Sequence, residues 1–283
     1  MKSVIIKPQN EILKKYVQYF LFFEKTDNRI LNYTTFPNNN ICLAIYKQNE
    51  VNYRNQSDVN NCIITKGSRN FISRIYGFHK TPFRVDINSC LDQICIIFYP
   101  SALKVFTAAS YKDLISSDTI FNEIFSTNNS YSLEQLFDLN DFEKRAAYLE
   151  NVLLKNLKDE SIPAKLKEAL YIIAENSSNI NLSIETLTKK LEISDSTLFR
   201  LFDNHLGQNP KSYIKTLRFR KALNEILNRR NSFTEIAYLN QYYDQAHFIN
   251  DFKTFSGHSP KNLTGQISVQ QNDLAWIFNK DCP

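Results

Sequence analysis

A few polar side chains in the last third of the chain have the types and positions needed to read the edges of DNA bases. A guanidinium such as that of Arg200 can donate two hydrogen bonds to O6 and N7 of guanine. Amides such as those of Gln245 and Asn250 can pair with an adenine edge, and an apolar side chain such as Ile249 can contact a thymine methyl group. These residues could therefore recognise a base sequence, provided that helices present them outward.

A near-repeat at a spacing of 50 residues predicts those helices. The pattern Leu198-x-x-x-Phe202-x-x-x-x-Gly207-x-x-Pro210-Lys211 recurs as Phe248-x-x-x-Phe252-x-x-x-x-Gly257-x-x-Pro260-Lys261. Each copy indicates an amphipathic helix that ends at a Gly and is stopped by a Pro. A shorter helical pattern precedes each copy, so we expect two units of helix, turn and helix.

The inward positions of the two copies agree, whereas the outward positions differ. We expect Ser194 to cap the first helix, with Leu198, Phe202 and Leu206 inside and Ser196, Thr197, Phe199, Arg200 and Asp203 outside. In the second helix we expect Phe248, Phe252 and Phe255 inside and Gln245, His247, Ile249 and Asn250 outside. The alternative for each outward residue is an ordinary solvated position. If both helices bind DNA, the site is asymmetric and the second helix carries less positive charge.

A basic segment connects the two units. From 208 to 230 it carries one acidic residue, Glu225, against Lys211, Lys215, Arg218, Arg220, Lys221, Arg229 and Arg230. These cations could meet phosphates, or they could simply form a solvated helix face. The apolar residues of this segment point to more than one side, which is typical of a helix wedged between two packed units. Such a helix would fix the separation of the two recognition helices.

Residues 165–264 resemble the DNA-binding domain of the AraC/XylS family of bacterial transcription regulators. The resemblance is carried by Leu198-Phe-Arg-Leu-Phe202, Gly207-x-x-Pro-x-x-Tyr213, Tyr242-Tyr-Asp-Gln-Ala-His-Phe248 and Asp251-Phe-Lys-x-Phe-x-Gly-x-Ser-Pro260. It implies that Ser196, Thr197, Arg200, Gln245, His247 and Asn250 contact bases. It also implies that Lys211, Ser212, Ser259 and Lys261, at helix N-termini, contact phosphates, to which the basic segment adds Lys215 and Arg218.

The chain departs from the family pattern at four positions. Glu192 and Gln241 stand where the family usually has a turn glycine, and a non-Gly residue at positive φ costs on the order of 1 kcal/mol. Asn250 stands where Arg is common, and Thr188 replaces a small Ala. An interaction module whose helix-turn-helix no longer binds DNA therefore remains an alternative.

The fold class that we expect is α+β: a strand-rich N-terminal domain, as a small barrel or curled sheet with helices, followed by an all-α domain with two helix-turn-helix units joined by a central helix. The boundaries that we expect are 1–158, a linker at 159–163, the DNA-binding domain at 164–265 and a tail at 266–283. We expect strands at 41–46, 61–65, 83–87 and 94–99, and helices at 11–19 and 101–109. After the linker we expect helices at 164–175, 184–191, 195–206, 210–228, 233–239 and 244–255, with a short one from 260.

Two features of the N-terminal half leave alternatives open. A helical stripe at 140–158 could pack on its own domain, form a dimer seam or dock on the DNA-binding half. An aromatic set could be plain core or could line a small effector pocket; it comprises Tyr46, Tyr53, Phe71, Tyr76, Phe78, Phe83 and Phe98. This half resembles more weakly the sensor or assembly domain of some AraC/XylS regulators, through Phe36-Pro37 and Ile97-Phe98-Tyr99-Pro100.

The remaining composition argues against an enzyme. Four dispersed histidines and five glycines provide neither metal-ligand spacing nor a phosphate-binding loop, so no cofactor or metal is expected. Five cysteines without C-x-x-C spacing indicate reduced thiols of a cytoplasmic protein, and no apolar run is long enough to span a membrane. The expected partners are double-stranded DNA, RNA polymerase if the protein activates, a small-molecule effector, and a second copy in a homodimer.

Overall fold

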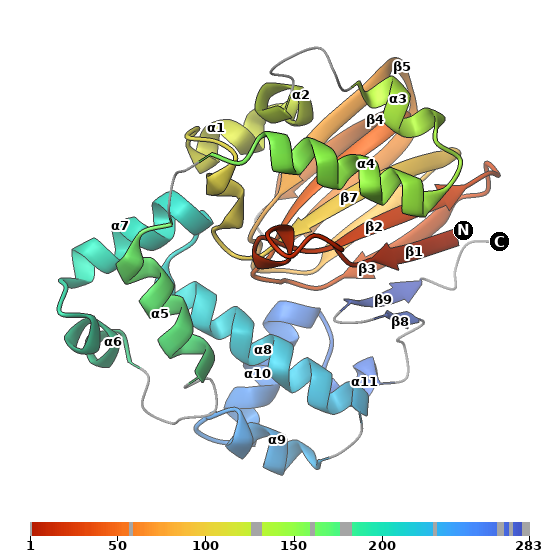
Figure 1. Ribbon diagram of the computed structural model, residues 1–283. Helices are drawn as coiled ribbons and strands as arrows, with labels where there is room; N and C mark the ends of the chain where they lie inside the picture. The colour runs from red at the N-terminus through yellow and green to blue at the C-terminus, as the bar shows by residue number, and fades with distance from the viewer. Residues whose placement is uncertain are drawn as a thin grey trace.

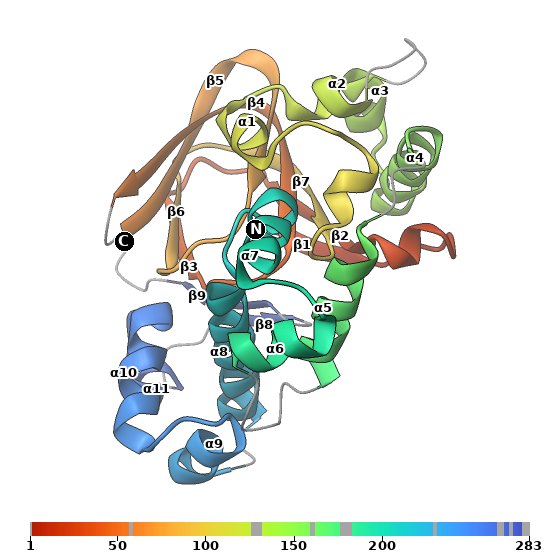
Figure 2. The same cartoon turned by 90° about the vertical axis from the view of Figure 1, so that its left-hand side faces the viewer.

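The computed structural model describes residues 2–56, 59–125, 132–158, 162–175, 183–228, 231–264, 269–271 and 274–278. Residues 2–158 build a curled sheet with four helices, here called the sheet region. The described residues between 162 and 264 build only helices, and this part is here called the helical region. Figures 1 and 2 show α1–α4 lying along the sheet and α5–α11 gathered at one end of it. The expected α+β class, with a curled sheet followed by helices, is confirmed.

One nine-stranded sheet runs in the order β1-β2-β7-β4-β5-β6-β3-β9-β8. All neighbouring strands are antiparallel except β5 and β6, which run parallel. The strands are β1 (Lys2–Ile6), β2 (Val17–Lys25), β3 (Leu31–Thr35), β4 (Ile41–Gln56), β5 (Val59–Tyr76), β6 (Phe83–Ile87), β7 (Leu91–Phe98), β8 (Val269–Gln271) and β9 (Leu274–Phe278). The long hairpin of β4 and β5 lets one sheet curl back on itself, because β5 pairs with β4 along its length and with β6 near its start.

The two faces of the sheet have separate cores. On the outer face, alternate residues such as Phe20, Ile94 and Phe98 pack against α1 (Tyr111–Ser116), α2 (Ile120–Phe125), α3 (Leu133–Asp138) and α4 (Phe142–Lys155). Residues of the opposite parity, such as Leu21 and Cys95, form a second cluster inside the curl. The stripe predicted at 140–158 therefore packs on its own sheet. Arg145 anchors α4 there through two hydrogen bonds to Asp92 on β7, at 2.7 and 3.0 Å.

The helical region follows the predicted pattern closely. Its helices are α5 (Ala164–Glu175), α6 (Ile184–Leu191), α7 (Asp195–Leu206), α8 (Pro210–Asn228), α9 (Phe233–Leu239), α10 (Gln245–Ser256) and α11 (Pro260–Leu263). One buried cluster joins α5, α6 and α7 to the first half of α8. A second joins α9, α10 and α11 to the second half of α8. The long helix α8 is thus wedged between two packed units, as expected.

Two predicted helices in the N-terminal half are wrong. The segment 11–19 forms only a 3-10 turn, η1 (Leu13–Lys15), before β2 begins at Val17. The segment 101–109 likewise contains only η2 (Ala102–Val105). The first prediction is wrong because Tyr19 belongs to β2, whose continuous apolar run lacks the alternation that distinguishes a strand from a helix.

The C-terminal tail returns to the sheet region. Strand β9 pairs antiparallel with β3, where Thr34 lies opposite Ile277. Ile277 is buried in the same cluster as the core of α9 and α10. Of the predicted linker, 159–161 lie outside the described residues, as do Arg229, Arg230 and Cys282. Among the described helices, none has the length and apolar character required to cross a bilayer.

Candidate nucleic-acid interface

The first helix-turn-helix unit consists of α6 and α7. Glu192 joins them with φ 52° and ψ 43°, so this non-Gly residue does adopt the left-handed turn conformation. Ser194 caps α7 by accepting a hydrogen bond from the Thr197 amide at 3.2 Å. Leu198, Phe202 and Leu206 are fully or almost fully buried, which confirms the predicted inward face.

The predicted base-contacting residues of α7 lie at its surface. Ser196 and Arg200 are exposed and Thr197 is partly buried. The Ser194 hydroxyl lies 2.9 Å from the Ser196 hydroxyl and 3.0 Å from that of Thr197, so these three hydroxyls form one polar group at the start of the helix. Phe199, one helical turn after Ser196, is 41% exposed despite its apolar ring. The outward face of α7 is therefore accessible along its N-terminal half.

The second unit, α9 and α10, repeats this arrangement. Gln241 occupies the turn with φ 61°, and Asp244 caps α10 by accepting from the His247 amide at 2.7 Å. Because Asp244 is the cap, the helix begins at Gln245, one residue later than predicted. A capping box between Ser232 and Glu235 starts α9. Phe248, Phe252 and Phe255 are buried, as predicted.

Of the four residues predicted outward on α10, Gln245, His247 and Asn250 are exposed, but the first two already have partners. The Gln245 side-chain oxygen accepts a hydrogen bond from the Thr234 hydroxyl at 3.0 Å. The His247 ring accepts one from the Tyr243 amide at 3.4 Å. Asn250 is exposed, whereas Ile249 is half-buried against the core. Tyr243, 93% exposed immediately before the cap, is a surface aromatic that sequence periodicity did not single out.

The predicted phosphate contacts divide into two groups. Lys211 and Lys261 are exposed in the first turns of α8 and α11, next to Ser212 and Ser259. By contrast, Lys215 forms an ion pair with Asp251 of α10 at 3.3 Å, and the Arg218 guanidinium lies 5.3 Å from the ring centre of Tyr242. These last two cations tie α8 to the second unit.

A loop of the sheet region contacts α8 directly. The Asn39 side chain, between β3 and β4, donates to the Tyr213 carbonyl at 3.0 Å and accepts from the Gln208 side chain at 3.3 Å. In the same loop, the Phe36 ring lies 6.4 Å from that of Phe219, edge to face. Sequence reasoning missed this contact, because no local signal pairs residues so far apart in the chain.

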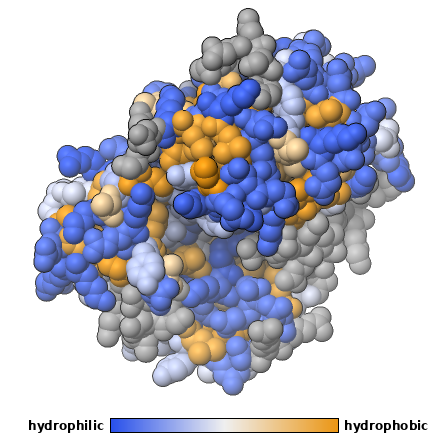
Figure 3. Space-filling view, in the orientation of Figure 1, coloured by the Kyte–Doolittle hydropathy of each residue, from blue (hydrophilic) through white to orange (hydrophobic). Residues whose placement is uncertain are grey.

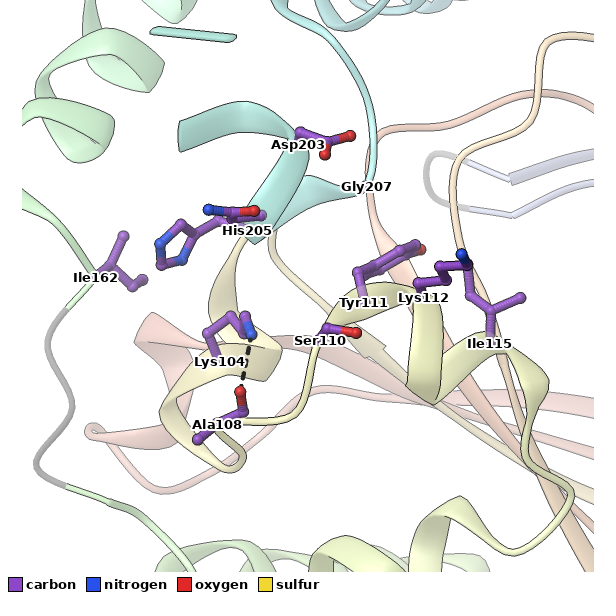
Figure 4. Close-up of a pocket in the computed structure, with 11 residues that line it drawn as sticks. Lys104, Ala108, Ser110, Tyr111, Lys112, Ile115, Ile162, Asp203, His205 and Gly207 are labelled. Atoms are coloured by element: carbon purple, nitrogen blue, oxygen red, sulfur yellow. Dashed lines mark hydrogen bonds between the residues drawn. The ribbon is translucent and has the colours of Figure 1, made fainter. Parts of the chain in front are cut away.

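A second contact lies between α1 and the end of α7. A cavity of about 690 Å³ opens there, and Figure 4 shows Lys104 and Tyr111 on one side of it and His205 and Gly207 on the other. The Tyr111 ring packs so closely on Gly207 that a Cβ atom at position 207 would lie 2.2 Å from it. The hydroxyl end of Tyr111 packs even more tightly on Gly77 of the sheet region, where a Cβ atom would lie 1.3 Å from the hydroxyl oxygen.

A smaller cavity of about 140 Å³ lies inside the curl of the sheet. Of the predicted aromatic set, Tyr46, Tyr76 and Phe83 line it. Phe71 and Phe98 instead belong to the core on the outer face of the sheet. Phe36 also lines this cavity, so the loop that contacts α8 forms part of its wall.

Known proteins show similarity to both halves of the chain. Residues 187–266 match a family described as "Helix-turn-helix domain", and residues 5–119 match a "Domain of unknown function". The transcriptional activator RhaS of Yersinia pestis is 37% identical over 71 residues, which cover 25% of this chain and 26% of RhaS. An uncharacterised helix-turn-helix transcriptional regulator of Haemophilus influenzae is 25% identical over 126 residues, 43% of this chain and 42% of the relative. The matched part of the chain thus spans 26% of the length of RhaS and 42% of the length of the second relative.

Among solved structures, ToxT of Vibrio cholerae aligns over 86% of this chain and 98% of its own, with a TM-score of 0.45 and 10% identity. The DNA-binding domain of AdpA, solved with a target DNA, aligns over 36% of this chain and 92% of its own, with a TM-score of 0.34 and 21% identity.

The chain therefore contains two helix-turn-helix units, α6–α7 and α9–α10, which share the helix α8 and lie beside a curled sheet. The chain carries an AraC-type helix-turn-helix domain at residues 187–266, as its motifs indicated.

Proposed function

We propose that this protein is a sequence-specific DNA-binding transcription regulator that inserts α7 and α10 into successive major-groove segments. The observation that carries the proposal is the pair of capped helices with exposed hydrogen-bonding side chains, held on the single helix α8. With 19 residues, α8 is about 28 Å long. That length is comparable to the separation of about 34 Å between major-groove segments one turn apart.

The base-reading residues would be Ser196, Thr197, Arg200, Gln245, His247 and Asn250. Arg200 is the strongest candidate, because an exposed guanidinium can bind guanine bidentately. The Gln245 side-chain oxygen already accepts a hydrogen bond from Thr234, which restricts its approach to a base. The second helix would therefore contribute less to affinity than the first.

Lys211, Ser212, Ser259 and Lys261 would bind phosphates, because they stand in the first turns or caps of α8 and α11. Lys215 and Arg218 would act mainly by holding α10 at a fixed angle to α8, since Asp251 and Tyr242 already engage them. Substitution of Lys211 or Lys261 should therefore reduce the salt dependence of DNA binding more than substitution of Lys215 or Arg218 does.

Residues 1–158 would form a sensor or dimerisation domain, joined by a linker at 159–163 to a DNA-binding domain at 164–265. Two observations support sensing: the cavity inside the curl, and the loop from Phe36 to Asn39 that both borders it and contacts α8. RhaS is named an activator. If this chain also activates, RNA polymerase would be a further partner.

A salt titration of DNA binding by the full chain tests the proposal. On DNA from its own promoter region, log Kd should rise linearly with log salt, because bound Lys and Arg release counterions. Arg200→Ala should weaken specific binding by about 1–3 kcal/mol, with a smaller effect on random DNA. Lys253→Ala, at an exposed position late in α10, serves as the control. Absence of binding at low salt would contradict the proposal and favour an interaction module.

A further inference from the structure

The cavity inside the curl is lined by residues of six strands, β2 to β7, that face away from α1–α4. Its wall includes Phe23 of β2, Tyr46 of β4, Cys62 of β5, Phe83 of β6 and Gln93 of β7. At about 140 Å³ it matches the size of an engineered apolar cavity of about 150 Å³ that binds benzene. The volume thus suits a single aromatic ring with few substituents.

The absence of charged side chains from the described wall restricts the charge of the ligand. No Asp, Glu, Lys or Arg is among the described residues that line the cavity. Burial raises the pKa of the Cys62 thiol to about 11 and lowers the pKa of His79 to about 4, so both side chains are uncharged near neutral pH. An ionised ligand would lose its hydration without gaining a counter-charge, which is costly.

One polar atom in the wall has no partner within the described part of the chain. Gln93 is 5% exposed, and its side-chain amide nitrogen donates to the Cys95 sulfur at 3.2 Å. Its side-chain oxygen is buried and accepts no hydrogen bond there. A buried acceptor left unpaired costs free energy, so a ligand that donates a hydrogen bond to it is favoured.

Two tyrosine hydroxyls of the wall are already paired. The Tyr46 and Tyr76 hydroxyls lie 3.0 Å apart, and that of Tyr76 also lies 3.8 Å from the Cys62 sulfur. The aromatic rings of the wall, such as Phe23 and Phe83, can pack edge to face or in an offset stack against an aromatic ligand. Among the described residues of the wall, the Gln93 side-chain oxygen is the buried polar atom that a ligand donor would satisfy.

We propose that this cavity binds an uncharged single-ring aromatic compound with one hydrogen-bond donor, of the chemical class of phenol, whose hydroxyl donates to the Gln93 side-chain oxygen. The inference rests on the proposed sensing role for its biological meaning, but binding itself does not depend on DNA. A bound ring would touch Phe36, whose own ring packs on Phe219 of α8. The ligand would thus adjoin the loop that joins the sheet region to α8.

Calorimetric titration of the full chain with phenol, toluene and benzoate, without DNA, tests the proposal. Phenol should bind saturably. Toluene, which lacks the donor, should bind about 2- to 12-fold more weakly, and benzoate at least roughly tenfold more weakly. Absence of saturable phenol binding, or benzoate binding as tight as phenol binding, would overturn the proposal.

Two substitutions locate the site. Gln93→Leu should make phenol and toluene bind equally, whereas the matched change Gln135→Leu on α3, away from the cavity, should leave the preference for phenol intact. Val85→Phe, which fills the cavity, should abolish binding while circular dichroism shows a folded chain. Unchanged phenol binding by both Gln93→Leu and Val85→Phe would overturn the assignment. A chain that binds DNA but not phenol would contradict this inference alone and leave the proposed function standing.

Discussion

The Asn39 side-chain amide donates a hydrogen bond to the carbonyl oxygen of Tyr213, 3.0 Å away, and this bond joins the β3–β4 loop to the helix shared by both helix-turn-helix units. The same side chain accepts from Gln208, in the turn before α8. Both partners are buried. Asn39 thus links the sheet region to the junction between α7 and α8.

Removing this link should lower stability. We expect Asn39→Ala to reduce the free energy of unfolding by about 1–3 kcal/mol, because the Tyr213 carbonyl and the Gln208 amide would lose a buried partner. Urea unfolding of the full chain measures the change. Asn40→Ala is the matched control, since that side chain donates a long hydrogen bond of 3.4 Å to Gln18 within the sheet region. Equal losses for the two variants would contradict a special role for Asn39.

The two glycines of the repeat should respond differently to substitution. Gly207 and Gly257 both end a recognition helix in the left-handed conformation, with φ 64° and 74°. Alanine at either position should cost on the order of 1 kcal/mol from backbone strain. Gly207→Ala should cost a further 1–3 kcal/mol or so, because its Cβ atom would collide with the Tyr111 ring, whereas at Gly257 the nearest atom is Pro82 Cγ at 3.4 Å.

Thermal or urea unfolding of the two alanine variants provides the comparison. In a Tyr111→Ala background, the change Gly207→Ala should cost less than it does in the wild type, because the clashing ring is absent. Equal stability of Gly207→Ala and Gly257→Ala would show that Tyr111 does not press on this turn.

The two turn residues with positive φ offer a gain in stability. Glu192 and Gln241 hold φ values of 52° and 61°, a conformation that glycine adopts without steric cost. Each change to glycine should raise the free energy of unfolding by up to about 1 kcal/mol. Glu185→Gly, inside α6, should instead lower it by about 1 kcal/mol. A loss of stability in Glu192→Gly would show that the carboxylate makes a compensating contact.

His79 should make stability depend on pH below neutrality. Burial, aided by nearby Arg220 and opposed by a hydrogen bond to Thr81, lowers the pKa of His79 to about 4. The unfolded chain takes up a proton near pH 6.5, and the folded chain takes it up only near pH 4, so stability falls as pH decreases through this window. Between pH 7 and pH 5 the expected loss from this group is about 2 kcal/mol.

Urea unfolding at the two pH values tests this expectation. His79→Phe should remove that part of the pH dependence, whereas His247→Gln, at the surface of α10, should retain it. If His79→Phe loses as much stability as the wild type between pH 7 and pH 5, other groups cause the effect.

The helical region could be predicted from sequence because its signals are local. The caps Ser194 and Ser232 and the terminal Gly207 mark helix ends within a few residues. Strand β2 could not be predicted, because its continuous apolar run is buried on both faces and lacks alternation. The contact of Asn39 with Tyr213 spans 174 residues, and that of Thr34 with Ile277 joins the two ends of the chain. Such pairings depend on the assembled fold.

Of the candidate site, sequence predicted most of the outward side chains, Ile249 excepted, but not the contacts that hold them. Arg200 and Asn250 are exposed as expected. Lys215 and Arg218 were predicted from charge alone, and their contacts with Asp251 and Tyr242 depend on how α10 packs against α8. Charge density in a sequence therefore identifies a basic surface without separating cations that meet phosphate from cations that brace a helix.

A chemical footprint of guanine N7 on promoter-region DNA tests the central claim most directly. With the full chain bound, we predict two protected major-groove segments on one face of the duplex, centred about 10 base pairs apart. Arg200→Ala should lose protection in one segment only. A single protected segment, or none, would contradict the insertion of α7 and α10 into successive segments.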